Sequence, residues 1–167
     1  MRIIYVAVSL LLLLIVSCQP IEAPVVTPAA LVTAVATPHP LPTLSPAIIA
    51  EGQAIYAANC ANCHGANLEG EPNWKEQNAD GSFRAPPHDE NGHTWHHGDA
   101  TLIEAIQKGG ARLNNLNIGG TSNMPAFEDI LTPEEITAVL TYIKSTWPED
   151  IQTIQWEVTQ REHAQSQ

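Results

Sequence analysis

Two of the three cysteines in the chain lie three positions apart, and a histidine follows the second at once, in the segment NCANCHGAN at 59–67. The order Cys60-x-x-Cys63-His64 is the attachment signature of c-type haem. Two thiols at this spacing can add to the two vinyl groups on one edge of a porphyrin, and the adjacent imidazole can bind the iron. The motif therefore predicts one covalent haem c per chain, with Cys60 and Cys63 as thioether links and His64 as an axial ligand.

Two other kinds of site also use a C-x-x-C pair. A thioredoxin-type redox motif needs a surrounding βαβ unit, and the sequence shows none. A structural zinc site needs a second Cys/His pair at matching spacing, and none follows. Haem attachment is therefore the favoured interpretation.

Composition singles out Met124 as a further candidate ligand. The chain has two methionines, and Met1 belongs to a segment that we interpret below as a cleaved signal. Met124 stands beside Pro125 in the polar loop GTSNMPAF, a poor position for a methionine that only fills a core. A thioether on the iron would favour the ferrous state and raise the reduction potential relative to a second histidine.

A long polar segment at 68–99 contributes further candidates. Arg84, His93 and Trp95 are expected to hydrogen-bond the haem propionates, because burying those charges unpaired is costly. The histidine spacing also permits a copper or zinc site, or replacement of Met124 by an imidazole. We favour the simpler interpretation, in which the histidines bond backbone or propionate groups; the four are His88, His93, His96 and His97.

Three helices are expected to position these residues. The first starts after Ser45-Pro46, an N-cap and a first-turn proline, and runs into the haem motif. Its apolar stripe is Ile48, Ile49, Gly52, Ile55 and Tyr56. The second lies in GDATLIEAIQKGG (98–110), with Asp99 as the cap and Gly109 as the stop.

The third helix, in LTPEEITAVLTYIKSTWP (131–148), has the clearest signals. Thr132 is the N-cap, Pro133 occupies the first turn and Glu135 completes a capping box. Its buried side is Ile136, Val139, Leu140 and Ile143. A short helix is expected to follow, with Ile151, Ile154 and Val158 inward, and no segment alternates with the period of a strand.

From residue 46 to residue 147 the sequence resembles the class I monohaem cytochromes c. The resemblance implies an all-α fold of three to five short helices wrapped around a covalently bound haem. In that family the first and last helices cross through a small residue and an aromatic one. Gly52 and Tyr56 stand in these places, opposite Val139, Tyr142 and Ile143.

The same resemblance implies roles for other residues. Met124, followed by Pro125, stands where the family places its sixth iron ligand. A proline carbonyl of the family accepts a hydrogen bond from the other nitrogen of the proximal imidazole. Either Pro86 or Pro87 can serve here, and the sequence does not choose between them.

The N-terminal 45 residues do not read as folded core. Residues 1–17 are interpreted as an export signal, because the apolar run at 3–16 is too short to span a bilayer. Ser17 before Cys18 resembles a lipoprotein cleavage site, which makes Cys18 a lipid attachment point. Residues 18–45 are rich in Pro, Thr and Ala and are expected to form a tether. The predicted domains are then 46–147, the cytochrome c domain, and 148–167, a helical extension.

The chain carries a formal net charge of −11, which argues against nucleic acid as a partner. This charge suits docking to a redox partner protein whose own surface is basic. We expect an electron carrier rather than an enzyme, lipid-anchored on the extracytoplasmic face of a bacterial membrane. The alternatives are a haem enzyme subunit with a labile sixth ligand, and a metal-binding module that uses the four histidines.

Overall fold

The computed structural model describes residues 40–113 and 118–167. The predicted signal peptide, Cys18 and most of the predicted tether lie outside these residues. No helix in the described ranges is long and apolar enough to cross a membrane. Five α-helices and two very short strands make up the regular structure of this part, together with two 3-10 turns. This confirms the predicted all-α fold.

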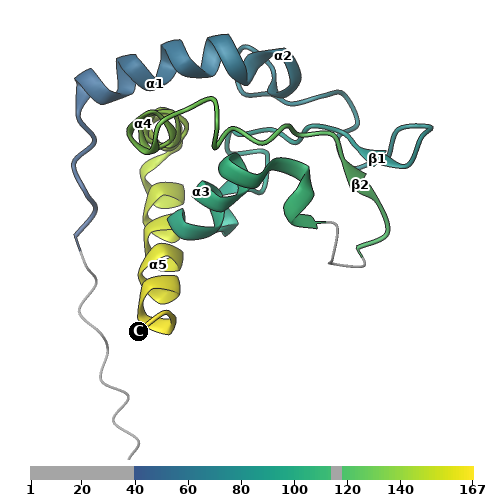
Figure 1. Ribbon diagram of the computed structural model, residues 1–167. Coiled ribbons are helices and arrows are strands. Elements are labelled where there is room, and N and C mark those ends of the chain that lie inside the picture. Colours follow the sequence, from purple (N-terminus) through teal and green to yellow (C-terminus); the bar gives the residue numbers. More distant parts are fainter. Residues whose placement is uncertain (1–39, 114–117) are drawn as a thin grey trace, which may run out of the picture. The chain divides into compact units, whose positions relative to one another are not determined.

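Helices α1 (Pro46–Asn59) and α4 (Pro133–Ser145) form the central crossing of the fold. Figure 1 shows α1 lying across α4, which is viewed end-on. A Cβ on Gly52 would lie 2.0 Å from the carbonyl oxygen of Ala138, so only glycine permits this approach. Tyr56 is 1% exposed, and its ring centroid lies 5.5 Å from that of Tyr142. The predicted small-residue and aromatic crossing is confirmed.

Local signals place α4 where the sequence predicts it. The Thr132 hydroxyl accepts from the Glu135 backbone N–H, and the Glu135 carboxylate accepts from the Thr132 N–H, which completes the capping box. Such a cap stabilises a helix by about 1 kcal/mol. Ser45 holds the N-cap position of α1, but its side chain makes no capping hydrogen bond.

Helix α3 (Asp99–Lys108) begins one residue earlier than predicted. Gly98 is the N-cap, and Asp99 is the first helical residue rather than the cap. The Asp99 carboxylate instead accepts hydrogen bonds from Lys144 at 2.9 Å and Gln155 at 2.7 Å. Gly109 ends the helix as predicted, and the 3-10 turn η2 (Gly109–Leu113) follows directly.

Helix α5 (Glu149–Gln165) is longer than the short helix predicted after Pro148, and it packs against α3 and the 3-10 turn η1 (Thr94–His96). The predicted inward face is wrong at Ile154, which is 41% exposed, whereas its neighbour Gln155 is fully buried. Gln155 faces inward because its amide donates to Asp99 and to the His97 carbonyl. Polar partners on α3 and directly after η1 thus set the orientation of this helix.

The two strands were not predicted from the sequence. β1 (Ser82–Phe83) pairs in parallel with β2 (Thr121–Ser122). Two-residue strands are too short to produce a period-two pattern. They join the polar segment at 68–99 to the loop that carries Met124.

The apolar core divides into two clusters of buried side chains. The first cluster lies between α1, the haem motif and the end of α4, and the second lies beneath the Met124 loop. The first consists of Tyr56, Leu68, Val139, Ile143 and Trp147, and the second of Phe127, Leu131 and Ile136.

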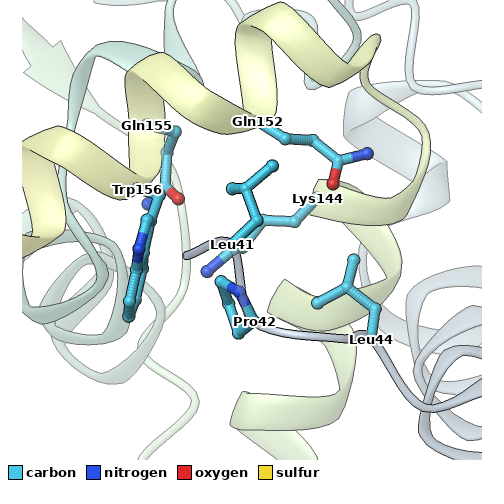
Figure 2. Close-up of a pocket in the computed structure, with 7 residues that line it drawn as sticks. All are labelled: Leu41, Pro42, Leu44, Lys144, Gln152, Gln155 and Trp156. Atoms are coloured by element: carbon cyan, nitrogen blue, oxygen red, sulfur yellow. The ribbon is translucent and has the colours of Figure 1, made fainter. Parts of the chain in front are cut away.

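A small pocket is lined by the residues before α1 together with side chains of α4 and α5. Figure 2 shows Leu41 between the α5 side chains Trp156 and Gln152, and Lys144 of α4 also lines the pocket. None of the candidate haem residues lines this pocket. Its walls show that the last residues of the predicted tether, from residue 41, lie against the C-terminal helix.

Candidate functional site

The haem motif forms a single helical turn at the end of α1. Cys60 caps α1 through its backbone N–H, which donates to Tyr56 O at 2.8 Å, and α2 (Ala61–His64) follows directly. Residues three apart in such a turn are neighbours on one face. Cys60 is half-buried and Cys63 is exposed, and no disulfide joins them. Burial raises the pKa of the Cys60 thiol to about 11, which keeps it protonated at neutral pH.

His64 is buried with one of its ring nitrogens already engaged. Its Nδ1 lies 2.8 Å from the carbonyl oxygen of Pro86. Because a carbonyl only accepts, Nδ1 carries the proton, and Nε2 is left with a free lone pair. Burial lowers the pKa of His64, against smaller raising effects of Pro86 and Glu71, so the ring is neutral at pH 7 as an iron ligand must be.

Pro87 has a different environment from Pro86, although the sequence did not separate them. Its carbonyl accepts from the Thr94 hydroxyl at 3.4 Å rather than from His64. Pro87 is buried, whereas Pro86 is half-buried. Of the two prolines, the structure therefore joins Pro86 to the imidazole.

Met124 lies in the segment before α4, half-buried against the second cluster. Its carbonyl accepts from Gly110 N–H at 2.8 Å. A Cβ on Gly109 would lie 2.3 Å from Pro125 O, and one on Gly110 would lie 2.2 Å from Ser122 O. Both obstacles are backbone atoms, so the glycine pair is what lets η2 contact the methionine loop. Sequence analysis treated Gly109 only as a helix stop and missed this second role.

Arg84 fits the expectation of a propionate partner. One guanidinium nitrogen donates to the Pro72 carbonyl at 2.7 Å, but Nε is buried and has no partner. An unpaired buried donor is costly, and an acidic group bound nearby would satisfy it. Trp95 fits less well, because its indole N–H already donates to Glu90 O at 3.3 Å.

The four histidines do not converge on one point. His93 stacks on Trp74 and meets His97 edge to face, and His96 stacks on Trp95 with centroids 3.7 Å apart. In the described part of the chain, no three His, Cys, Asp or Glu side chains are grouped as a metal site requires.

His88 differs from the other three histidines because it lies against the haem motif. Its ring stacks on that of His64, with centroids 4.0 Å apart and planes 22° apart. Burial lowers the pKa of His88 well below its usual value, and nearby His64 and His93 act in the same direction. Sequence analysis grouped His88 with the cluster, because nothing local signals a contact across 24 positions.

The sequence matches the family description Cytochrome c over residues 49–147. This chain belongs to the cytochrome c family. Two subunits described as "Cbb3-type cytochrome c oxidase subunit FixP" are similar to it. The one from Bradyrhizobium sp. is 34% identical over 63% of this chain and 30% of its own length. The one from Rhizobium etli is 28% identical over 61% of this chain and 31% of its own length.

This cytochrome c thus spans about a third of the length of the curated relatives that it matches. No solved structure shows a significant match to it. Family membership confirms the predicted cofactor, a covalently attached haem c, and the predicted general role, haem-based electron transfer.

Proposed function

We propose that this cytochrome c is a membrane-tethered monohaem electron carrier. In this proposal Cys60 and Cys63 hold the haem through thioethers, and His64 and Met124 are its axial ligands. One observation carries the assignment of the proximal side. The imidazole that follows the cysteines is buried, and its Nδ1 is occupied by Pro86 O at 2.8 Å, so that only Nε2 can bind iron.

Bound haem c supplies a one-electron ferric/ferrous couple, and the residues around it control the environment. The Pro86 carbonyl accepts a hydrogen bond from His64 Nδ1–H, which raises the basicity of His64 as a ligand. The two apolar clusters exclude water, which disfavours the extra charge of ferric iron. His64 and Met124 would together fill both axial positions of the iron, which would leave no position there for a substrate.

Arg84 would bind a propionate through its unpaired Nε. A guanidinium N–H that faces a carboxylate makes a charge-assisted hydrogen bond, stronger than a neutral one. The haem acids would therefore lie near the loop at 72–84.

The location and the partner belong to the same proposal. Cys18 would carry a lipid, and residues 18–45 would let the domain reach its partners from the extracytoplasmic face of a bacterial membrane. Similarity to cbb3-type oxidase subunits suggests delivery of electrons toward a terminal oxidase, through a basic surface on the partner. The net charge of −11 on this chain supports docking to a basic surface.

A spectroscopic experiment tests the core of the proposal. Protein purified from a host that matures cytochromes c is denatured in alkaline pyridine, which reports covalent haem with two thioethers. We expect Cys60→Ser or Cys63→Ser to leave at most one thioether, whereas the control Cys18→Ser keeps both. Colourless wild-type protein with alkylatable thiols at residues 60 and 63 would overturn the proposal.

The sixth ligand has its own readout. A sulfur-to-iron charge-transfer band in the ferric protein identifies methionine ligation, and carbon monoxide binding to the ferrous protein detects an open site. We expect the band to be present and carbon monoxide binding to be slow. Rapid binding would instead favour an enzyme subunit with a labile sixth ligand.

A further inference from the structure

We propose that His88 is a positioning residue, which sets the plane of the His64 imidazole on the iron and shields it from water. The inference rests on the proposed function, because it takes His64 as the proximal ligand. Its basis is the stack of the two rings, with centroids 4.0 Å apart and planes only 22° apart.

The Pro86 hydrogen bond alone does not fix the orientation of His64. It defines where Nδ1 lies, but the ring can still tilt about the line that joins its two nitrogens. A flat group against one face removes that freedom, because tilting would push the rings into each other. Pro86 and His88 thus restrain the same imidazole from its edge and from its face.

His88 can act in this way because it is itself immobilised. Its Nδ1 lies 2.9 Å from the Thr94 hydroxyl, which in turn donates to Pro87 O at 3.4 Å. Its backbone N–H donates to Leu68 O at 2.7 Å, and its carbonyl accepts from the Trp147 indole at 2.7 Å. Trp147 follows α4, so the restraint on His64 extends to the helix crossing.

The orientation of an axial imidazole has measurable consequences in a ferric haem. The ring plane decides which iron d orbital the ligand π system overlaps, which sets the spread of the haem-methyl NMR shifts and the anisotropy of the EPR signal. Shielding acts on a different quantity, the reduction potential, because water near the ligand stabilises the ferric charge.

Four variants separate orientation from shielding. His88→Phe keeps a flat ring, so we expect the haem-methyl pattern of the wild type. His88→Leu fills similar space without a plane, so we expect the pattern to change while the potential moves little. His88→Ala admits water and should shift the reduction equilibrium toward the ferric form by on the order of ten-fold. Thr94→Val removes the anchor of His88 together with the hydrogen bond from the Thr94 hydroxyl to Pro87 O, keeps the His88 ring, and should reproduce part of the change in the pattern.

The matched control is His96→Leu, since His96 stacks on Trp95 in the same segment without touching His64. It should leave both the pattern and the potential unchanged. A wild-type haem-methyl pattern in both His88→Leu and Thr94→Val would overturn the role of His88. If no His88 variant folds, the pattern of Thr94→Val alone tests the proposal. Failure of the proposed function is distinct, because it appears in the wild type as the absence of histidine and methionine ligation.

Discussion

At the scale of single residues, the Met124 thioether carries the sharpest prediction. Met124→Ala should lower the reduction potential by on the order of 0.1 V, a fraction of the roughly 0.8 V over which axial ligands act. It should also open the ferrous iron to carbon monoxide. Potentiometry and gas binding measure the two effects, and the exposed Ile130→Ala serves as the control. If neither quantity changes, the sixth ligand is another side chain.

The lowered pKa values of His93 and His97 predict that the folded protein loses stability in acid. Burial lowers the pKa of His93, and His97 and His96 add to it. Burial also lowers the pKa of His97, with Arg112 adding to the effect and Glu162 opposing it. Unfolded histidines take up protons near about pH 6.5, so the unfolded state binds more protons and stability falls as the pH drops below this value.

The variant that tests this prediction is His93→Asn. Its free energy of unfolding and that of the wild type are measured by urea unfolding between pH 8 and pH 5. Its stability should decline less than that of the wild type over this range, because one proton-binding difference is gone. The comparison at pH 8 is the internal control, since both imidazoles are neutral there and only the packing of residue 93 against Trp74 and His97 differs. If stability depends on pH equally in the two proteins, His93 does not contribute to the loss of stability in acid.

At the scale of elements, the crossing of α1 and α4 depends on Gly52. Replacing glycine by alanine inside a helix ordinarily stabilises it by up to about 1 kcal/mol. Here the new Cβ would meet Ala138 O at 2.0 Å and Tyr142 Cβ at 2.9 Å. Gly52→Ala should therefore destabilise the protein by about 1–3 kcal/mol in urea unfolding, while the exposed Gln53→Ala changes little. A stabilised Gly52→Ala protein would show that the helices do not cross here.

The attachment of α5 depends on a polar cluster rather than on an apolar face. Asp99 accepts from Lys144 and Gln155, and Glu162 accepts from the backbone N–H groups of Gly98 and Thr101. Asp99→Ala would leave Lys144 unpaired, with its side chain only 12% exposed. We expect a loss of roughly 1–3 kcal/mol and faster hydrogen exchange in α5. Exchange in α5 no faster than in the Asp129→Ala control would contradict this attachment.

At the scale of the whole molecule, sequence analysis succeeded where the signals are local. Three features were predicted from a few consecutive residues each: the haem motif, the capping box at Thr132 and the glycine stop of α3. The contacts that it missed join distant positions. Ile154 has the more apolar side chain, yet Gln155 is buried because its partners lie on α3 and directly after η1, more than fifty positions earlier.

The candidate site divides in the same way. Cys60, Cys63 and His64 are neighbours in the sequence, so their types and spacing were enough to propose their chemistry. The choice of Pro86 over Pro87, and the stacking of His88 on His64, depend on how the polar segment folds back over the motif. No period or spacing within that segment encodes this path.

The charge of the whole molecule predicts how it meets small redox reagents. With a net charge of −11, the protein attracts a cationic cobalt ammine complex and repels an anionic iron cyanide complex. Added salt shortens the Debye length from about 30 Å at 0.01 M to about 3 Å at 1 M, which weakens both effects. Stopped-flow rates should therefore fall several-fold for the cation and rise for the anion. The sign difference between the two reagents is its own control, because a general effect of salt on the protein would move both rates in one direction. A rate that falls with salt for the anion and rises for the cation would mean that the haem edge lies in a locally basic surface, and the basic docking partner would then have to be abandoned.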